Sequence, residues 1–340
     1  MIERGIGSLD PLIGLRRGTY SRAIGSDGDE RVQTGKLVTR GSKLFGKTGM
    51  RIEQLIDIGD QSVESLWIIS YIPYPDQESE DQVGGTLVAS IFDSLGKHWV
   101  LEGKWEDEGE VLRWKKPGED PGRADDPDQD EAPTEITWEF TDDGRLGAKA
   151  MVAGRIVAAY KTAIQPGKER FPHLPSGEGV GVLAKLAPLL GRWENSWKVV
   201  RKFNGEEEKL DGKATVVGRR ILGGHFIEEV QTPHEPTPGN QGDLTIIGAA
   251  EEGSAGDENL RLWFRGQSPP IPAAWKGLPL GITVDHVSRP HGDFKIVSKG
   301  GGRFLSDDHR TFESYLHVTS DDAGLDDEVR ISGDVKRLPE

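Results

Sequence analysis

Two stretches of this chain match each other without a gap at a spacing of 177 residues. They cover residues 8–46 and 185–223, and ten of the 38 positions from Leu9 to Gly46 are identical, five of them glycines. A repeat with so long a period indicates two tandem domains of one fold rather than a solenoid, whose units are much shorter. The identical pairs are Leu9/Leu186, Pro11/Pro188, Leu12/Leu189, Gly14/Gly191, Gly28/Gly205, Glu30/Glu207, Gly35/Gly212, Lys36/Lys213, Gly41/Gly218 and Gly46/Gly223.

The ends of the two halves match as well, because residues 155–161 resemble residues 330–336. We therefore expect one domain over 8–165 and a second over 183–340. The segment between them, 166–182, is rich in proline and glycine and is interpreted as a linker.

Composition narrows the class of protein. The 45 glycines and 20 prolines in 340 residues favour many short elements joined by turns. An acidic stretch at 117–133 with almost no apolar residues is interpreted as a solvated loop of the first domain. The net charge of −15 argues against nucleic acid as a partner, since phosphates would be repelled.

The chain has no cysteine, which excludes disulfides and cysteine-based metal sites. No run of about 18 apolar residues predicts a membrane span. We expect a soluble, cytoplasmic protein without a cofactor.

The second half opens on a short helix followed by a strand. The stretch 181–190 has apolar residues suited to one or two helical turns that end at Gly191, where a left-handed cap suits glycine. In the residues that follow, Trp193, Asn195 and Trp197 fall on one side of an extended chain and charged or polar residues on the other. This alternation predicts a half-buried strand.

Further strand patterns follow at short intervals in both halves, separated by turn signals such as Asn-Gly and Gly-Gly. No alternation of strands with helices is present. Eight or nine consecutive short strands in the second half, a pattern that the first half repeats, favour a closed antiparallel barrel, because closure leaves no exposed edge. The predicted fold class is all-β, with two tandem antiparallel barrels, each opened by a short helix.

One opening motif carries a resemblance to a known family. Leu186, Leu189, Gly191 and Trp193, together with the hairpin "GRRILGGHFIEE" and the closing "ISGDVKR", resemble a bacterial lipocalin-like family of unknown function. The resemblance implies calycin-type β-barrels, present here as a tandem duplication.

The first half departs from this motif at two positions. Arg16 stands at the position of Trp193, and Tyr20 stands at the position of Trp197. A cavity is therefore expected in the second barrel, which keeps both inward tryptophans.

Four residues of the second half are candidates for contact with a ligand. Trp193 is expected to pack against the short helix, whereas Asn195 and Trp197 lie further along the same inward face. His286 shares a face with apolar residues of its strand, and Arg265 follows an apolar strand. These four side chains, Asn195, Trp197, Arg265 and His286, predict a site for a small apolar or amphipathic molecule. No catalytic or metal-binding set is predicted.

The strand at 66–72 is apolar on both faces. A barrel strand needs only one apolar face, so the second face should be covered. We expect Trp67, Ile69 and Tyr71 to form this outer face and to be buried against the other barrel, a protein partner or a second copy of the chain.

Three functions remain open on these grounds. The first is a non-enzymatic binding protein. The alternative is a structural or interaction subunit of a protein assembly, with barrels filled by their own side chains. The third is an enzyme, whose chemistry no motif identifies.

Overall fold

A computed structural model describes most of the chain. The described residues are 6–24, 31–73, 85–106, 111–116, 135–141, 144–152, 155–165, 169–203, 206–237, 241–249, 258–264, 271–276, 284–291, 294–320 and 325–339. They fold as two compact units, the first ending at Pro175 and the second beginning at Ser176.

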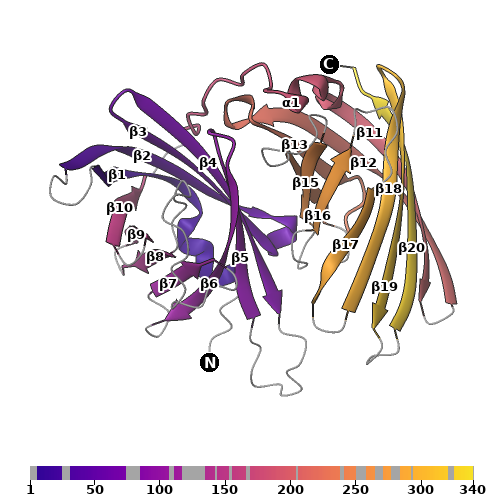
Figure 1. Ribbon diagram of the computed structural model, residues 1–340, viewed down its shortest axis with the longest axis horizontal. Coiled ribbons are helices and arrows are strands. Elements are labelled where there is room, and N and C mark those ends of the chain that lie inside the picture. Colours follow the sequence, from indigo (N-terminus) through magenta and orange to yellow (C-terminus); the bar gives the residue numbers. More distant parts are fainter. Residues whose placement is uncertain are drawn as a thin grey trace. The chain divides into compact units, whose positions relative to one another are not determined.

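The first unit is a closed antiparallel barrel of ten strands, shown in Figure 1. Each strand pairs with its neighbour in the chain, and β1 closes the barrel against β10. The elements are η1 (Ile6–Leu12), β1 (Gly14–Ile24), β2 (Arg31–Leu44), η2 (Phe45–Lys47), β3 (Gly49–Ile58), β4 (Gln61–Pro73), β5 (Gly85–Asp93), β6 (His98–Glu106), β7 (Val111–Lys115), β8 (Glu135–Phe140), β9 (Leu146–Val152) and β10 (Arg155–Ile164).

The second unit is a curled antiparallel sheet of ten strands (Figure 1). Its first strand, β11, pairs with both β12 and the last strand, β20. The elements are α1 (Val182–Lys185), η4 (Ala187–Leu189), β11 (Gly191–Phe203), β12 (Glu206–Ile221), η5 (Leu222–Gly224), β13 (Phe226–Pro233), β14 (Asp243–Ala249), β15 (Glu258–Phe264), β16 (Ile271–Lys276), β17 (Val284–His291), β18 (Phe294–Ser306), β19 (His309–Ser320) and β20 (Leu325–Arg337).

The all-β prediction is confirmed, and so is a closed barrel in the first unit. In the second unit the sheet starts at β16 and ends at β17, and no hydrogen-bonded pairing of described residues joins these two strands. β16 contains Pro272 and β17 contains Pro290. Proline has no backbone N–H to donate, which is why it favours strands at a sheet edge.

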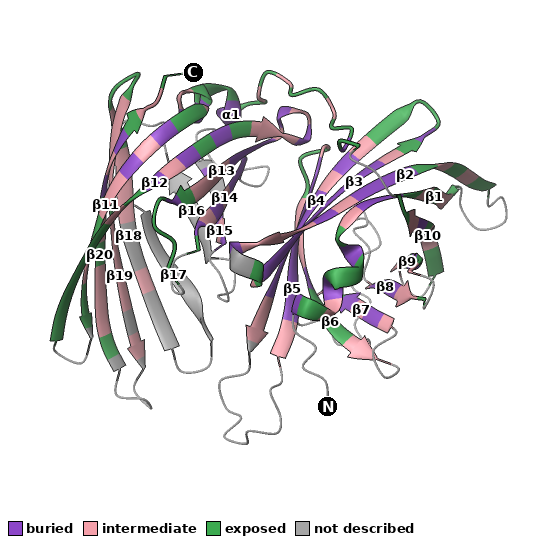
Figure 2. Cartoon of the chain, turned by 180° about the vertical axis from the view of Figure 1, so that it is seen from behind, coloured by how far each residue is buried: buried purple, intermediate pink, exposed green. Residues whose placement is uncertain are grey.

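Alternation along the strands separates inside from outside. In β12 the buried residues from Ala214 onward alternate with exposed ones, seen as bands in Figure 2. In the first unit alternate residues of neighbouring strands build one core cluster, with Leu9 and Leu12 of η1 packed into it. The short opening helix therefore plugs one end of the barrel.

The second unit is plugged in the same way. Leu186 and Leu189 are 1% and 3% exposed and pack with Ile227 and Ile247. Gly191, at the start of β11, has φ = 104°, a conformation that glycine adopts without strain.

The first hairpins of the two units share one register. Gly14 pairs with Gly41 in the first, and Gly191 pairs with Gly218 in the second. A Cβ at Gly41 would lie 2.1 Å from the carbonyl oxygen of Leu12, and at Gly218 it would lie 2.2 Å from that of Leu189. Glycine is required there because the helix backbone lies directly on the strand.

We expect Gly41→Ala to destabilise the first unit by about 2 kcal/mol or more, because the methyl group cannot fit against a backbone oxygen. Gly7→Ala is the matched control, since a Cβ at Gly7 meets nothing within 4 Å. Urea unfolding compares the two variants. Equal midpoints would contradict the close packing of helix on strand.

The last strands of the two units, β10 and β20, correspond in the structure at a spacing that differs by two residues from the spacing in the sequence match. Arg16 pairs with Ile164, and the equivalent Trp193 pairs with Arg337. Ile164 and Arg337 are therefore equivalent in register, at a spacing of 173 residues rather than the 175 read from the sequence. A shift of two keeps each side chain on the same face of the sheet, so the alternation pattern alone does not reveal it.

Candidate functional site

A cavity of about 350 Å³ lies inside the first barrel. It sits toward the end of β1 remote from η1, because Tyr20 and Arg22 of that strand line it. Its size falls within the range of small-molecule sites in proteins. The lining residues are Tyr20, Arg22, Ala23, Gln54, Ile56, Trp67, Ile136, Ala150, Val157, Ala158 and Tyr160.

A cluster of tryptophans lies beside the cavity. Trp67 packs on Trp138 at a ring distance of 5.0 Å and on Trp114 at 6.1 Å. All three are buried, and Trp67 is the one that belongs to the cavity lining. The tryptophans fill part of the barrel interior, and the cavity lies next to Trp67.

Small side chains on the opposite wall leave this space open. Ala150 of β9 and Ala158 of β10 line the cavity. The register of β10 against β9 shifts between Ile156 and Ala158, a β-bulge. An extra residue in one strand lets two neighbours point to the same side, which is why Val157 and Ala158 both face the cavity.

The polar groups of the lining come mainly from two facing tyrosines. Tyr20 and Tyr160 pair directly across β1 and β10. Gln54 donates from Nε2 to the Tyr160 hydroxyl oxygen at 3.3 Å, and its Oε1 accepts from Ser65 Oγ at 3.4 Å. Burial raises the pKa of both tyrosines, so the two phenols stay protonated at neutral pH.

Among the described residues of the lining, Arg22 supplies the one cationic group. Its Nε and one terminal nitrogen donate to Gln33 Oε1 at 3.1 and 3.0 Å. Of the described residues that line the cavity, none is acidic. The site is therefore an apolar pocket with hydrogen-bond donors and one positive charge.

The predicted outward position of Trp67, Ile69 and Tyr71 is wrong. Trp67 and Ile69 are 5% and 0% exposed and belong to the interior core cluster, with Tyr71 packed against it. They cannot form an interface. The other face of the strand carries Leu66 and Ile68, which are also buried. Because both faces are apolar, the alternation did not say which one points inward.

Trp193 lies against the short helix of the second unit, as expected. Its indole N–H donates to the Leu189 carbonyl at 3.3 Å. The guanidinium of Arg337 lies 4.1 Å from the ring centroid of Trp193, and that of Arg310 lies 5.0 Å from it. These contacts fill the plugged end of the second unit.

Asn195 and Trp197 lie along the same strand toward the other end. Asn195 is 2% exposed and donates to Gln231 Oε1 at 2.8 Å, and Gln231 in turn donates to Asp243 at 3.0 Å. The Oδ1 of Asn195 and the indole N–H of Trp197 have no hydrogen-bond partner among the described residues. A ligand role for this pair stays a prediction.

The remaining two predicted residues are not placed. Arg265 lies outside the described residues. The backbone of His286 is part of β17, opposite Ser298, but its side chain lies outside what the structure describes. The acidic stretch 117–133 is likewise outside the described part of the chain.

Charged groups also line up on the inward face of the second unit. Arg310 pairs with Glu229 at 2.8 Å, and both side chains are largely buried. Burial lowers the pKa of the nearby Arg261 to about 10. Sequence analysis missed this pair, because arginine and glutamate in a strand pattern usually indicate a solvated face.

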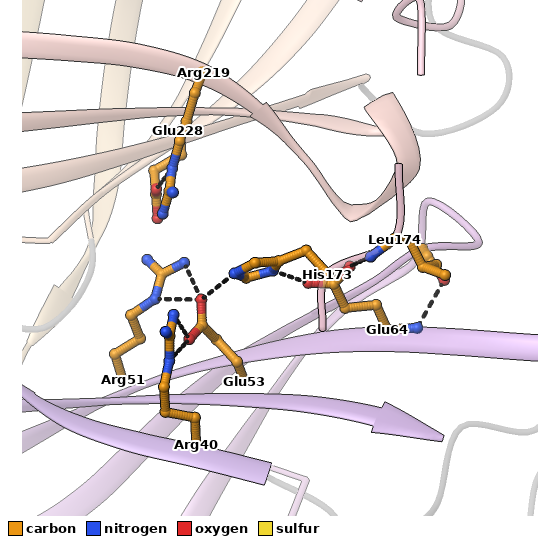
Figure 3. A network of polar contacts seen from close by, with 9 residues as sticks. Arg40, Arg51, Glu53, Glu64, His173, Leu174, Arg219 and Glu228 are labelled. Atoms are coloured by element: carbon orange, nitrogen blue, oxygen red, sulfur yellow. Dashed lines mark hydrogen bonds and ion pairs between the residues drawn. The ribbon is translucent and has the colours of Figure 1, made fainter. Parts of the chain in front are cut away.

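A polar network on the outer wall of the first barrel holds the linker, as Figure 3 shows. Glu53 pairs with Arg40 and Arg51, and the His173 ring contacts Glu64 at 2.7 Å. Burial alone would raise the pKa of Glu53, but the two guanidiniums outweigh it and hold this pKa below its usual value. Next to it, Phe171 packs in an apolar cluster on the same unit. This network is structural, because each charge is satisfied by a neighbour.

Metal sites and membrane-spanning helices each have structural requirements that can be compared with the described part of the chain. No three histidine, aspartate or glutamate side chains there converge as a metal site requires. No helix among these residues is long and apolar enough to cross a membrane.

Sequence analysis missed the cavity residues Tyr20, Arg22, Gln54 and Tyr160. The signal that could have found them is the run of small residues in β9 and β10, "LGAKAMV" and "RIVAAY". Alanines on an inward face leave space that the opposite wall does not fill.

No family model matches this chain, and no curated protein matches it significantly. Among solved structures it is similar to a protein of unknown function of the DUF3598 family from Nostoc punctiforme, at 10% identity over 99% of this chain and 100% of that one, with a TM-score of 0.28. The beta domain of the Bordetella autotransporter BrkA is similar at 9% identity over 95% and 98% of the two chains, with a TM-score of 0.12. These scores are too low to carry an inference about this chain.

Proposed function

We propose that the first barrel binds a small amphipathic molecule and that the protein acts as a non-enzymatic binding protein. The observation that carries this proposal is the cavity of about 350 Å³, lined mostly by apolar side chains together with a few polar groups. Sites for small ligands commonly combine these features. The proposal moves the site from the second barrel, where the inward tryptophans had suggested it, to the first.

We also propose that the two units are duplicated calycin-type barrels. The shared hairpin register at Gly14/Gly41 and Gly191/Gly218 supports this, as does the plug of each unit by a short helix. The same register recurs at a spacing of 177 residues, where the sequence repeat also lies.

Filling the cavity tests the binding function. We expect Ala158→Trp to reduce binding of the neutral fluorescent probe N-phenyl-1-naphthylamine at least tenfold, because the indole occupies the space of the ligand. Ala159→Trp is the matched control, since Ala159 neighbours Ala158 and is not part of the lining. Fluorescence titration measures both. Unchanged binding in Ala158→Trp would contradict the site.

The same titration examines the second unit. Asn195 Oδ1 and the Trp197 indole N–H, both buried without a partner among the described residues, support a second ligand contact there. Probe binding that survives in Ala158→Trp and is lost when Trp197→Ala is added would support that site. If no probe binding survives in Ala158→Trp, the second unit does not bind this probe, and the alternative of a barrel filled by its own side chains gains support.

A further inference from the structure

Among the described lining residues of the first cavity, Tyr20, Tyr160 and Arg22 carry hydrogen-bond donors toward a ligand. Gln54 already uses its Nε2 on Tyr160 and its Oε1 on Ser65. The Tyr160 oxygen accepts in that contact, so its own O–H is available to a ligand. The Tyr20 hydroxyl keeps its proton at neutral pH, because burial raises its pKa. A ligand that presents acceptor atoms fits such a lining.

Arg22 adds a positive charge that no described carboxylate neutralises. Its Nε and one terminal nitrogen both donate to the neutral amide of Gln33. Other arginines of the same barrel differ, as Arg40 pairs with Glu53 and Arg113 with Glu135. In a chain with a net charge of −15, an arginine at a cavity without an acidic neighbour in the described structure is a place for an anion.

Two sides of the cavity differ in the size of their side chains. In the closed order of ten strands β4 lies five strands from β9, so Trp67 and Ala150 face each other across the barrel. The lining therefore places an indole opposite the small side chains of Ala150 and Ala158, which leave room for a ring system beside the indole. Aromatic rings gain additional energy by packing on an indole, which a saturated ring lacks.

We propose that the ligand of the first barrel is a planar aromatic carboxylic acid, with its carboxylate at Arg22 and Tyr20 and its rings between Trp67 and the alanine wall. This inference rests on the proposed binding function and specifies its ligand class. The carboxylate accepts from the guanidinium and the phenol, and the rings fill the apolar part of the cavity.

The test compares three molecules of one shape by isothermal titration calorimetry. 2-Naphthoate carries the acid and the planar rings, 2-naphthamide lacks the charge, and decahydro-2-naphthoate lacks the planarity. We expect 2-naphthoate to bind at least tenfold more tightly than each of the other two. The amide is weaker because a charge-assisted hydrogen bond is stronger than a neutral one. The saturated acid is weaker because it cannot pack an aromatic ring on the indole of Trp67.

Substitution of Arg22 tests whether this side chain causes the preference for 2-naphthoate over 2-naphthamide. Arg22→Met is expected to bring 2-naphthoate to within about threefold of 2-naphthamide and to leave 2-naphthamide binding unchanged. Arg17→Met is the matched control, since Arg17 lies exposed on the same strand and pairs with Glu169 at 2.6 Å. Its naphthoate preference should equal that of the parent.

The outcomes separate this inference from the proposed function. If 2-naphthoate and 2-naphthamide bind equally tightly, the ligand does not need a carboxylate. If decahydro-2-naphthoate binds as tightly as 2-naphthoate, the ligand does not need a planar ring. Either result contradicts the proposed ligand class and leaves the binding function in place. A preference for the acid that survives Arg22→Met overturns the role of Arg22. No binding of any of the three overturns the ligand class, and the neutral probe titration then decides the function separately.

Discussion

Trp67→Asp is expected to unfold the first barrel, with a loss of at least about 5 kcal/mol in its free energy of unfolding. Removing a buried tryptophan alone costs about 3–5 kcal/mol, and a buried carboxylate adds a desolvation cost. The side chain packs on Trp138 and Trp114, so the change reaches the centre of the core. Calorimetry and near-ultraviolet circular dichroism follow the loss of the folded unit.

The control for this variant is Gln61→Asp, which places the same carboxylate at an exposed position of the same strand. It should melt within a few degrees of the parent. A Trp67→Asp protein that stays folded but loses an oligomer would contradict the inward position and would restore the interface predicted from the sequence.

Arg16→Ala is expected to destabilise the first barrel by about 3 kcal/mol. The Arg16 side chain is fully buried and donates to the carbonyl oxygens of Pro11 and Gly144, each at 2.8 Å. Hydrogen bonds to charged groups contribute about 1.5–3 kcal/mol each, and the two carbonyls would lose their donor. Urea unfolding of the single variant measures the loss.

A second substitution tests whether Arg16 in the first unit and Arg337 in the second unit hold the opening helix in the same way. In the second unit Arg337, on the last strand, donates to the carbonyl of Pro188, the equivalent of Pro11. Ile164 occupies the register position of Arg337. We therefore expect Ile164→Arg to restore part of the stability lost in Arg16→Ala, whereas Ile156→Arg, at an exposed position of the same strand, should restore none. Equal effects of the two arginines would contradict the equivalence.

Several features of this protein follow from local sequence patterns. The repeated glycines predict the hairpin register, because a glycine is needed wherever a strand lies against a helix carbonyl, as at Gly41 and Gly218. The residues around Gly191 predict a short helix followed by a strand, since capping and alternation act over a few neighbours. The all-β class follows in the same way from closely spaced strand and turn signals.

The inward face of β4 and the position of the cavity were decided by the closure of the barrel. Trp67 faces inward because Trp114 and Trp138, which come from strands much later in the chain, pack against it. The cavity exists because Ala150 and Ala158 stand across from that cluster, and its charge comes from Arg22 on a third strand. Each of these contacts joins residues far apart in sequence, and an apolar pattern on both faces of a strand has no local preference for either side. Which face points inward is therefore a property of the packed barrel.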